Sequence, residues 1–166
     1  QAQIIASAVV KQRFRKGALI VETGKKSNAL FIILNGRAHV VATDGRGREA
    51  ILAHLKQGDY IGEMSLIDNL PHSASVRTDV QTDVLVLARA QFAKILPEYA
   101  AMTYVIMKTL VQRLRHADRK IESLALMDVY GRVANALIEM ADLDDEDGLV
   151  IRSKVSHQNL AKTVGA

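Results

Sequence analysis

The stretch GDYIGEMSLIDNLPHSASVR, residues 58–77, contains the residue types that phosphate-binding loops use. Gly62 permits a tight turn, and the residues after it begin a short helix whose free backbone N–H groups can bind an anion. Glu63 is an acceptor beside that position and suits a ribose hydroxyl rather than a phosphate. His72 stands where a bidentate cation is expected, and its imidazole is mostly neutral near pH 7. The alternative is a tight structural turn with a solvated Glu63.

The composition is that of an ordinary soluble globular protein. The 166 residues are 49% hydrophobic and 24% charged, which provides enough apolar surface for a full core. No apolar run approaches the ~20 residues that span a bilayer, and the first residues, QAQIIASAVVKQ, lack the pattern of a signal peptide. The lack of cysteine excludes disulfides, a thiolate nucleophile, cysteine-ligated zinc and iron–sulfur clusters. We therefore expect a cytoplasmic protein with no membrane partner.

Residues 9–90 show the short, β-rich runs of a closed antiparallel barrel or jelly roll. Gly, Asn and Asp turn signals separate the runs, and Asp44-Gly45 is typical of a hairpin. Helix-like pieces interrupt the pattern at residues 1–7 and 62–68. The predicted strands are 18–21, 29–34, 38–43, 49–55, 73–80 and 83–88.

A helical period replaces the strand pattern in the following part of the sequence. Residues 89–96 predict a short helix ended by Pro97, and residues 98–126 predict a long helix without Gly or Pro. Apolar residues recur along the long helix in alternating steps of 3 and 4, the a/d pattern of a parallel two-stranded coiled coil. In that register Arg113 at g meets Asp118 at e of a second chain. The alternative is a helix that lies on its own barrel. The a/d residues, which we expect at the dimer interface, are Met107, Leu110, Leu114, Ala117, Ile121 and Leu124.

The C-terminal part predicts a helix, an acidic loop, a strand and a second helix. The first helix covers residues 128–142. The acidic run 142–148 lacks EF-hand spacing, because its glycine is the seventh residue from the first Asp rather than the sixth, and we interpret it as a solvated loop. Residues 149–153 predict a strand. Ser156 is placed to cap a last helix that stops at Gly165.

The remaining candidates for metal or catalytic chemistry are weak. A jelly-roll metalloenzyme requires a His-x-His pair, which the sequence lacks, so we interpret His39 and His54 as histidines on a strand face. No nucleophile–base–orienter set and no paired general acid/base carboxylates can be recognised from spacing. We therefore expect neither an enzyme nor a metal site.

Two segments, NALFIILNGRAHVV and GDYIGEMSLI followed by PHSASVR, resemble the cyclic-nucleotide-binding β-roll. The long helix, LMDVYGRVANALI and VSHQNLAKTVGA resemble, in the same order, the catabolite-activator and fumarate–nitrate-regulator (Crp–Fnr) family of bacterial transcription factors. The resemblance implies an α+β fold. Its parts are an antiparallel β-roll sensor at 1–97, a dimerisation helix at 98–127 and the N-terminal part of a winged helix-turn-helix domain at 128–166. The sequence ends where the recognition helix is expected, so we expect no specific operator binding by these residues alone.

The resemblance also implies a function. In this family an effector binds in the β-roll against the dimerisation helix and reorients the DNA-binding domains of a homodimer, with RNA polymerase as a further partner. Ser156, His157 and Gln158 would then touch at most DNA phosphates. The alternatives are a cyclic-nucleotide sensor with another output, such as a kinase or a channel, and a family member that needs no ligand. The dimer seam and the beginning of a helix-turn-helix favour the regulator.

The family's site residues transfer position by position. The resemblance places the phosphate-facing amides at Gly62 to Ser65 and the ribose-binding carboxylate at Glu63. It places the family's Arg-Ser pair on His72-Ser73. The adenine-contacting Thr-Ser pair of the long helix falls on Ala117-Asp118, and the hinge Asp falls on Asp128. The expected effector-binding residues are therefore Gly62, Glu63, Met64, Ser65, His72, Ser73, Ala117 and Asp118.

Two of these positions depart from the family pattern. His72 replaces a permanent, forked cation, which costs on the order of 2–4 kcal/mol of binding free energy, roughly 30- to 1000-fold in affinity. Ala117 removes a hydroxyl that reads adenine, and Asp118 adds an acceptor where purine N7 also accepts. We therefore do not expect tight cyclic AMP binding. The hypothesis is a guanine-containing cyclic mono- or dinucleotide, including cyclic di-GMP, because Asp118 with Arg115 or Arg119 complements guanine. The alternative role of Asp118 is the interhelix pair described above.

Overall fold

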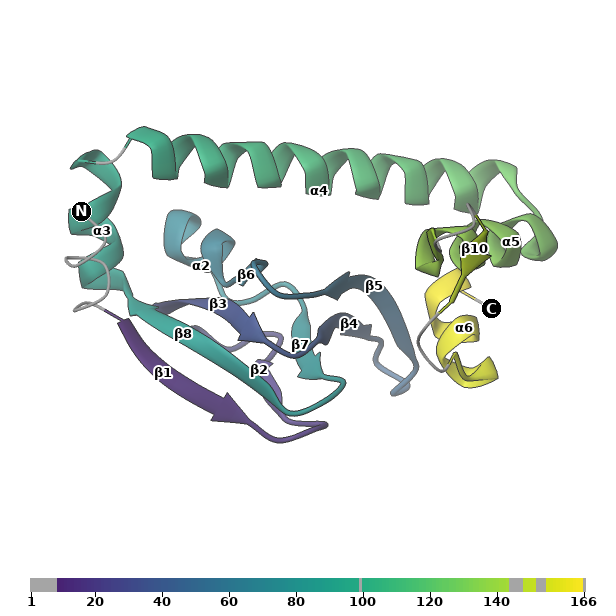
Figure 1. Cartoon of the computed structure of the whole chain (residues 1–166), viewed down its shortest axis with the longest axis horizontal. Coiled ribbons are helices and arrows are strands. Elements are labelled where there is room, and N and C mark those ends of the chain that lie inside the picture. The colour runs from purple at the N-terminus through teal and green to yellow at the C-terminus, as the bar shows by residue number, and fades with distance from the viewer. Residues whose placement is uncertain (1–8, 99, 144–147, 152–154, 166) are drawn as a thin grey trace. The chain divides into compact units, whose positions relative to one another are not determined.

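The chain forms two compact units, Gln1–Tyr104 and Val105–Ala166. Figure 1 shows that the first unit holds the long strands and that the second is mainly helical. The helix-like piece predicted at residues 1–7 and the acidic residues 144–147 lie outside the described residues. The computed structural model describes residues 9–98, 100–143, 148–151 and 155–165.

Two four-stranded antiparallel sheets make up the β-roll of the first unit, as the described residues show (Figure 1). Their strand orders are β1-β8-β3-β6 and β2-β7-β4-β5. Strands far apart in the chain are thus neighbours, which is the topology of a jelly roll and confirms the predicted antiparallel β-roll. The strands are β1 (Val9–Phe14), β2 (Leu19–Val21), β3 (Ala29–Asn35), β4 (Ala38–Thr43), β5 (Glu49–Leu55), β6 (Tyr60–Ile61), β7 (Ser75–Thr78) and β8 (Thr82–Ala88).

The core of the β-roll is filled from both sheets. Side chains alternate between the two faces of a strand, so Ile33 of β3 and Val84 of β8 are buried while their neighbours are partly exposed. Each such side chain contributes about 1.5–3 kcal/mol relative to an exposed one. The buried core residues are Ile20, Val21, Phe31, Ile33, Ala38, Leu55, Ile61, Val76 and Val84.

The strand β1 is not predicted as a separate run, because most of its side chains are exposed and it carries little apolar alternation. It pairs with β8 at the edge of its sheet. Arg13 and Lys11 of β1 lie 2.7 Å and 2.9 Å from the carboxylate of Asp83. Hydrogen bonds from Arg13 and Lys11 hold the pKa of Asp83 well below its usual range. Cross-strand ion pairs therefore accompany this edge pairing, and a hydrophobic pattern does not reveal them.

The predicted turn at Asp44-Gly45 is confirmed in place, but its geometry differs from a two-residue hairpin. Residues 44–48 connect β4 to β5. One carboxylate oxygen of Asp44 accepts hydrogen bonds from the N–H groups of Arg46 and Arg48, each at 2.9 Å. Gly47, not Gly45, takes the positive φ of 78°.

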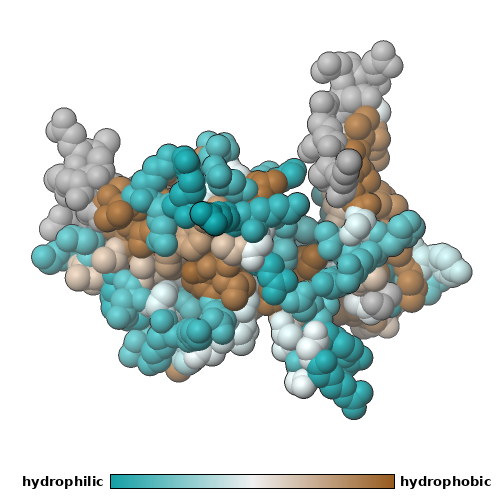
Figure 2. Space-filling model, turned by 90° about the horizontal axis from the view of Figure 1, so that it is seen from below, coloured by the Kyte–Doolittle hydropathy of each residue, from teal (hydrophilic) through white to brown (hydrophobic). Residues whose placement is uncertain are grey.

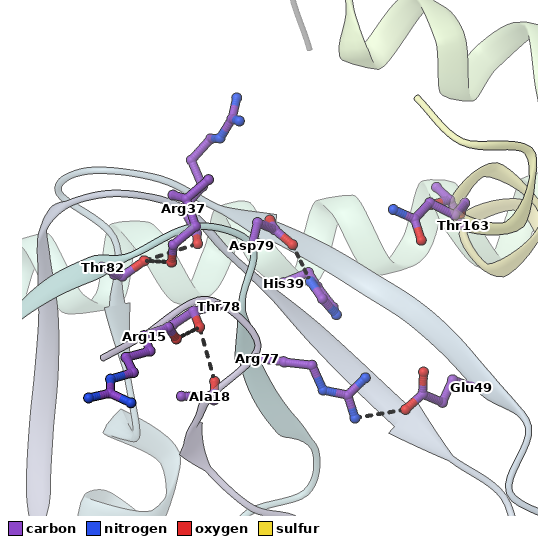
Figure 3. A network of polar contacts seen from close by, with 12 residues as sticks. Arg15, Ala18, Arg37, His39, Glu49, Arg77, Thr78, Asp79, Thr82 and Thr163 are labelled. Carbon is purple, nitrogen blue, oxygen red and sulfur yellow. Dashed lines mark hydrogen bonds and ion pairs between the residues drawn. The ribbon is translucent and has the colours of Figure 1, made fainter. Parts of the chain in front are cut away.

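Polar contacts join the strands and turns of the sheet β2-β7-β4-β5 (Figure 3). The buried Thr78 hydroxyl lies 2.7 Å from the carbonyl oxygen of Arg15. His39 and His54 are register partners on β4 and β5, which confirms them as strand-face histidines. His39 Nδ1 lies 2.6 Å from Asp79 Oδ1. Among the described residues, no group of three or more His, Asp or Glu is arranged to hold a metal ion.

The helices follow the predicted order with shifted ends. The short helix α3 continues one residue past Pro97, and α4 begins two residues after the predicted start of the long helix. The helix predicted at 128–142 ends at Met140, because residues 142–143 pair with residues 149–150 as a two-stranded hairpin. The elements are α2 (Glu63–Asp68), α3 (Arg89–Glu98), α4 (Ala100–Leu126), α5 (Val129–Met140), β9 (Asp142–Leu143), β10 (Leu149–Val150) and α6 (His157–Val164).

Local caps define the helices of the second unit. The carboxylate of Asp128 accepts a hydrogen bond from the N–H of Gly131 at 2.8 Å and begins α5. The hydroxyl of Ser156 accepts from the N–H of Asn159 at 3.1 Å and begins α6, as predicted. Gly165 ends α6 with a φ of 70°, the left-handed conformation that glycine adopts without strain.

Gly36, in the turn between β3 and β4, has a φ of 102°, and a Cβ there would lie 2.5 Å from Thr82 Oγ1 and 2.8 Å from Gln81 O. We expect Gly36→Ala to lower the free energy of unfolding by about 2–4 kcal/mol, through backbone strain and overlap. Urea unfolding followed by circular dichroism measures this. Gly45→Ala is the matched control, since its Cβ meets nothing within 4 Å. The effect of Gly45→Ala on the free energy of unfolding is expected to stay within about 0.5 kcal/mol. Equal losses for the two variants would contradict the steric role of Gly36.

Candidate functional site

Gly62 determines how α2 enters the β-roll. Its φ is 93°, and a Cβ at this position would lie 2.9 Å from the backbone oxygen of Ala29. Only glycine combines this conformation with this close approach. Gly62 also precedes α2 without providing a side-chain cap, so the first N–H groups of the helix receive no side-chain acceptor from it.

The residues after Gly62 divide between the interior and the surface. Glu63 and Ser65 are each only 2% exposed, whereas Met64 is 52% exposed. The Oγ atom of Ser65 is buried and has no hydrogen-bond partner among the described residues. Buried polar groups are nearly always hydrogen-bonded, so this hydroxyl is available to a ligand or a water molecule. Of the predicted cassette, Gly62, Glu63 and Ser65 therefore lie on the inner side.

His72 lies beside this cassette, as the sequence pattern predicts. Its Cε1 is 3.6 Å from the position of a Cβ on Gly62, and its Nε2 is 2.9 Å from the hydroxyl of Ser27. Its own backbone is held by two hydrogen bonds of 2.9 Å to Gly24 and Lys25. Burial lowers the pKa of His72, and the charge of Glu63 acts in the opposite direction. The imidazole is therefore neutral at pH 7, which agrees with the interpretation of the sequence.

Two residues of the site are missed by the sequence. Ser27, which contacts His72, lies 45 residues before it in a loop. Arg89 donates from Nη2 to the carbonyl oxygen of Ser65 at 2.8 Å and from Nη1 to that of Leu66 at 3.3 Å. It thus satisfies backbone acceptors of α2 that the helix itself leaves free. Neither residue belongs to a local motif, because each acts across the fold on a distant segment.

The other predicted effector residues are not brought to this position by the described contacts. Ser73 is exposed next to His72. Ala117 and Asp118 are exposed residues of α4 and belong to the second unit. Their place opposite the cassette stays a prediction.

The predicted dimer seam is largely exposed in the single chain. Leu114 and Ile121 are 62% and 65% exposed, and Met107 and Ala117 are also exposed. Leu110 is half-buried, and Leu124 is 3.5 Å from the position of a Cβ on Gly165, so it also contacts the end of α6. Figure 2 shows brown apolar areas among the teal hydrophilic surface, which agrees with the many large apolar side chains that remain exposed.

The residues predicted for the hinge and for DNA contacts lie at helix starts in the second unit. Asp128 caps α5, and Ser156 caps α6. His157 and Gln158 are exposed in the first turn of α6. Their contact with a DNA backbone stays a prediction.

Comparison with known proteins agrees with these features. Residues 11–99 match the family model of the cyclic nucleotide-binding domain. The chain is 30% identical over 163 residues to the cAMP-activated global transcriptional regulator Vfr of Pseudomonas aeruginosa, covering 93% of this chain and 75% of Vfr. It is 28% identical over 158 residues to the cAMP-activated global transcriptional regulator CRP of Salmonella typhimurium, covering 92% of this chain and 74% of CRP. The structure of the c-di-GMP responsive global regulator CLP of Xanthomonas campestris has the same fold, with a TM-score of 0.86, 24% identity, and coverage of 99% of this chain and 85% of CLP.

The matched domain covers more than half of the chain and includes the β-roll and its cassette. The chain therefore belongs to the Crp–Fnr family of transcription regulators. Among the described residues no helix can cross a bilayer, since even the 27-residue α4 lacks the necessary apolar character.

The burial of His72 leads to a testable titration. The pKa of His72 in the folded state lies below the ordinary value of 6.5. The contribution of the neutral ring to the free energy of unfolding is therefore fully present above pH 6.5. This contribution is lost as the pH falls below 6.5 towards the folded-state pKa. We expect the Cε1 proton signal of His72, followed by NMR, to titrate below pH 6.5.

Glu63→Gln removes the charge that raises this pKa, so the titration should move to still lower pH. Asp68→Asn is the matched control, because Asp68 is an exposed carboxylate at the other end of α2. A His72 signal that titrates at or above 6.5, or that responds equally to both variants, would show that burial does not govern the ring.

Proposed function

We propose that this protein is an effector-responsive, homodimeric DNA-binding transcription regulator of the cytoplasm. The effector is a nucleotide bound in the β-roll, and its binding shifts the DNA-binding domains of the dimer. The proposed domains are the sensor at 1–97, the dimerisation helix at 98–127 and the N-terminal part of a winged helix-turn-helix at 128–166. The observation that carries the proposal is the cassette: Gly62 brings the buried Glu63 and the unpartnered Ser65 hydroxyl to the inner side of a cyclic nucleotide-binding domain.

The chemistry of the cassette suits a sugar phosphate. A buried carboxylate such as Glu63 accepts hydrogen bonds from ribose hydroxyls, and the Ser65 hydroxyl has no hydrogen-bond partner within the described part of the chain. Backbone N–H groups at the start of α2 face the phosphate in this proposal. Ser73 is exposed beside His72 and completes the phosphate side.

The base and the charge of the effector follow from the residues that differ from the family pattern. His72 is neutral and hydrogen-bonded to Ser27, so it supplies no permanent cation for a cyclic phosphate. Relatives such as Vfr and CRP are cAMP-activated, and we infer that this chain binds cyclic AMP more weakly. Asp118 of α4 with Arg115 or Arg119 complements guanine, which favours cyclic GMP or cyclic di-GMP.

A second copy of the chain is the proposed partner of α4. Its a/d residues leave an apolar stripe exposed on the single chain, and a parallel twofold mate would cover that stripe. Arg113 at g and Asp118 at e would then meet across the dimer. This register competes with the guanine-reading role of Asp118. Tighter binding of cyclic GMP or cyclic di-GMP than of cyclic AMP in the experiment below would favour the guanine-reading role.

The output is proposed to be DNA, with RNA polymerase as a further partner. α5 begins at the hinge residue Asp128, and α6 begins at Ser156 with its first turn exposed. Such an arrangement is typical of the first helix of a helix-turn-helix pair. We propose that Ser156, His157 and Gln158 contact at most DNA phosphates there.

Isothermal titration calorimetry with cyclic AMP, cyclic GMP and cyclic di-GMP tests the effector. We expect His72→Arg to strengthen cyclic AMP binding by roughly 30- to 1000-fold, because a forked cation replaces a neutral ring. His157→Arg makes the same chemical change on exposed α6 and should leave every affinity unchanged. Silence of the wild-type protein for all three nucleotides would favour a ligand-independent regulator. Equal effects of the two Arg variants would reject the β-roll as the site.

Sedimentation velocity tests the dimer. Leu114 occupies an a position and is 62% exposed in the single chain. We expect Leu114→Glu to weaken dimerisation roughly 100-fold or more, because a charge would be buried in each half of the seam. Arg115→Glu changes the neighbouring exposed position outside the seam and should leave the dimer intact. A wild-type protein that sediments as a monomer at all concentrations would overturn the proposed dimer.

A further inference from the structure

A cavity of about 110 Å³ lies within the second unit, apart from the β-roll. α4, α5 and α6 all contribute to its walls. Leu124, Ala136 and Val164 provide apolar lining. The polar and charged residues on which the inference depends are His116, Arg119, Lys120, Arg132, Glu139 and Thr163.

The charges of this lining do not balance. Arg119, Lys120 and Arg132 are cations, and His116 adds an imidazole. Glu139 is the one carboxylate among the described residues that line the cavity. A cavity with this excess of cations is complementary to an anion that carries more than one charge.

The guanidinium of Arg132 lacks full compensation for its burial. The Nε atom of Arg132 is buried and has no hydrogen-bond partner among the described residues. Burial lowers the pKa of Lys120, and the charge of Glu139 only partly opposes this effect. A buried N–H donor without an acceptor costs free energy that a charged acceptor in the cavity would recover.

We propose that this cavity binds a phosphate group, held by Arg132, Lys120 and Arg119. Guanidinium and ammonium groups are the usual donors to phosphate oxygens, and the small volume suits one tetrahedral oxyanion. The hydroxyl of Thr163 already donates to the carbonyl oxygen of Asn159 at 2.9 Å, so α6 supplies a wall rather than a donor. The ligand is either inorganic phosphate or the phosphate of a small ester. Phosphate bound here would connect α4 to α5, with α6 as a wall of the cavity. This binding would not depend on an effector in the β-roll.

Phosphorus-31 NMR titration of the 166-residue chain with inorganic phosphate, in a chloride buffer of constant ionic strength, tests the site. We expect saturable binding that Arg132→Met weakens by about tenfold or more, because a charged donor is lost. Lys108→Met removes one cation from an exposed position of α4 outside the cavity and should bind phosphate like the wild type. A parallel titration with glycerol 3-phosphate, an ester without a nucleoside, compares the sources. Tighter binding of the ester assigns the site to a phosphate ester, and tighter binding of the free ion assigns it to inorganic phosphate.

A second variant, Glu139→Gln, distinguishes a loss of phosphate binding from a folding defect in Arg132→Met. It removes the opposing carboxylate from the cavity, so phosphate binding should become stronger by about threefold or more, which an unfolded variant cannot show. The proposal is overturned if the wild-type chain shows no saturable phosphate binding. It is equally overturned if Arg132→Met and Lys108→Met bind phosphate with the same affinity, or if Glu139→Gln does not bind phosphate more tightly than the wild type.

Discussion

The close approach of Gly62 to the backbone oxygen of Ala29 is the contact on which the candidate site depends. At 2.9 Å from that oxygen, a Cβ has no room, and the φ of 93° is one that side chains rarely adopt. The backbone can therefore turn directly from β6 into α2 at the inner side of the sheet. The burial of Glu63 and Ser65 and the position of His72 beside the turn follow from this single geometry.

Burial gives the site its electrostatic character. A carboxylate and an imidazole share a space that excludes much of the water, so the imidazole loses its proton readily and hydrogen-bonds to Ser27. The site therefore offers the carboxylate of Glu63, a neutral ring and the Ser65 hydroxyl, which no described residue uses. In the proposed function, recognition of the ribose by Glu63 is retained, while attraction for a phosphate through a permanent cation is reduced.

The helix α4 has two differently composed faces. One carries the apolar a/d residues that the proposed dimer covers, such as Leu114 and Ile121. The other carries His116, Arg119 and Lys120, which line the cavity with residues of α5 and α6. If both proposals hold, one rigid element links the twofold mate to the beginning of the DNA-binding domain. Leu124 belongs to both sets, so the cavity adjoins the C-terminal end of the seam.

The sequence by itself determined the features that depend on local spacing. Periods of two and of three to four residues located most strands and the helices. A short-range cap such as Ser156 is readable because donor and acceptor lie only three residues apart. The cassette Gly62–Glu63 with His72 was also predictable, because it lies within one short stretch. The two-residue strands β6 and β9 are too short for any period to appear, and β1 is an exposed edge strand.

Only the tertiary structure decided which distant residues meet. Ser27 with His72, Arg89 with Ser65 and His39 with Asp79 are separated by 24 to 45 residues. These contacts depend on the order of strands in the two sheets, which no local pattern specifies. The same reason applies to the cationic cavity. Its members on α4 look like solvated charges in the sequence, and only the packing of three helices gathers them with Arg132 around one cavity.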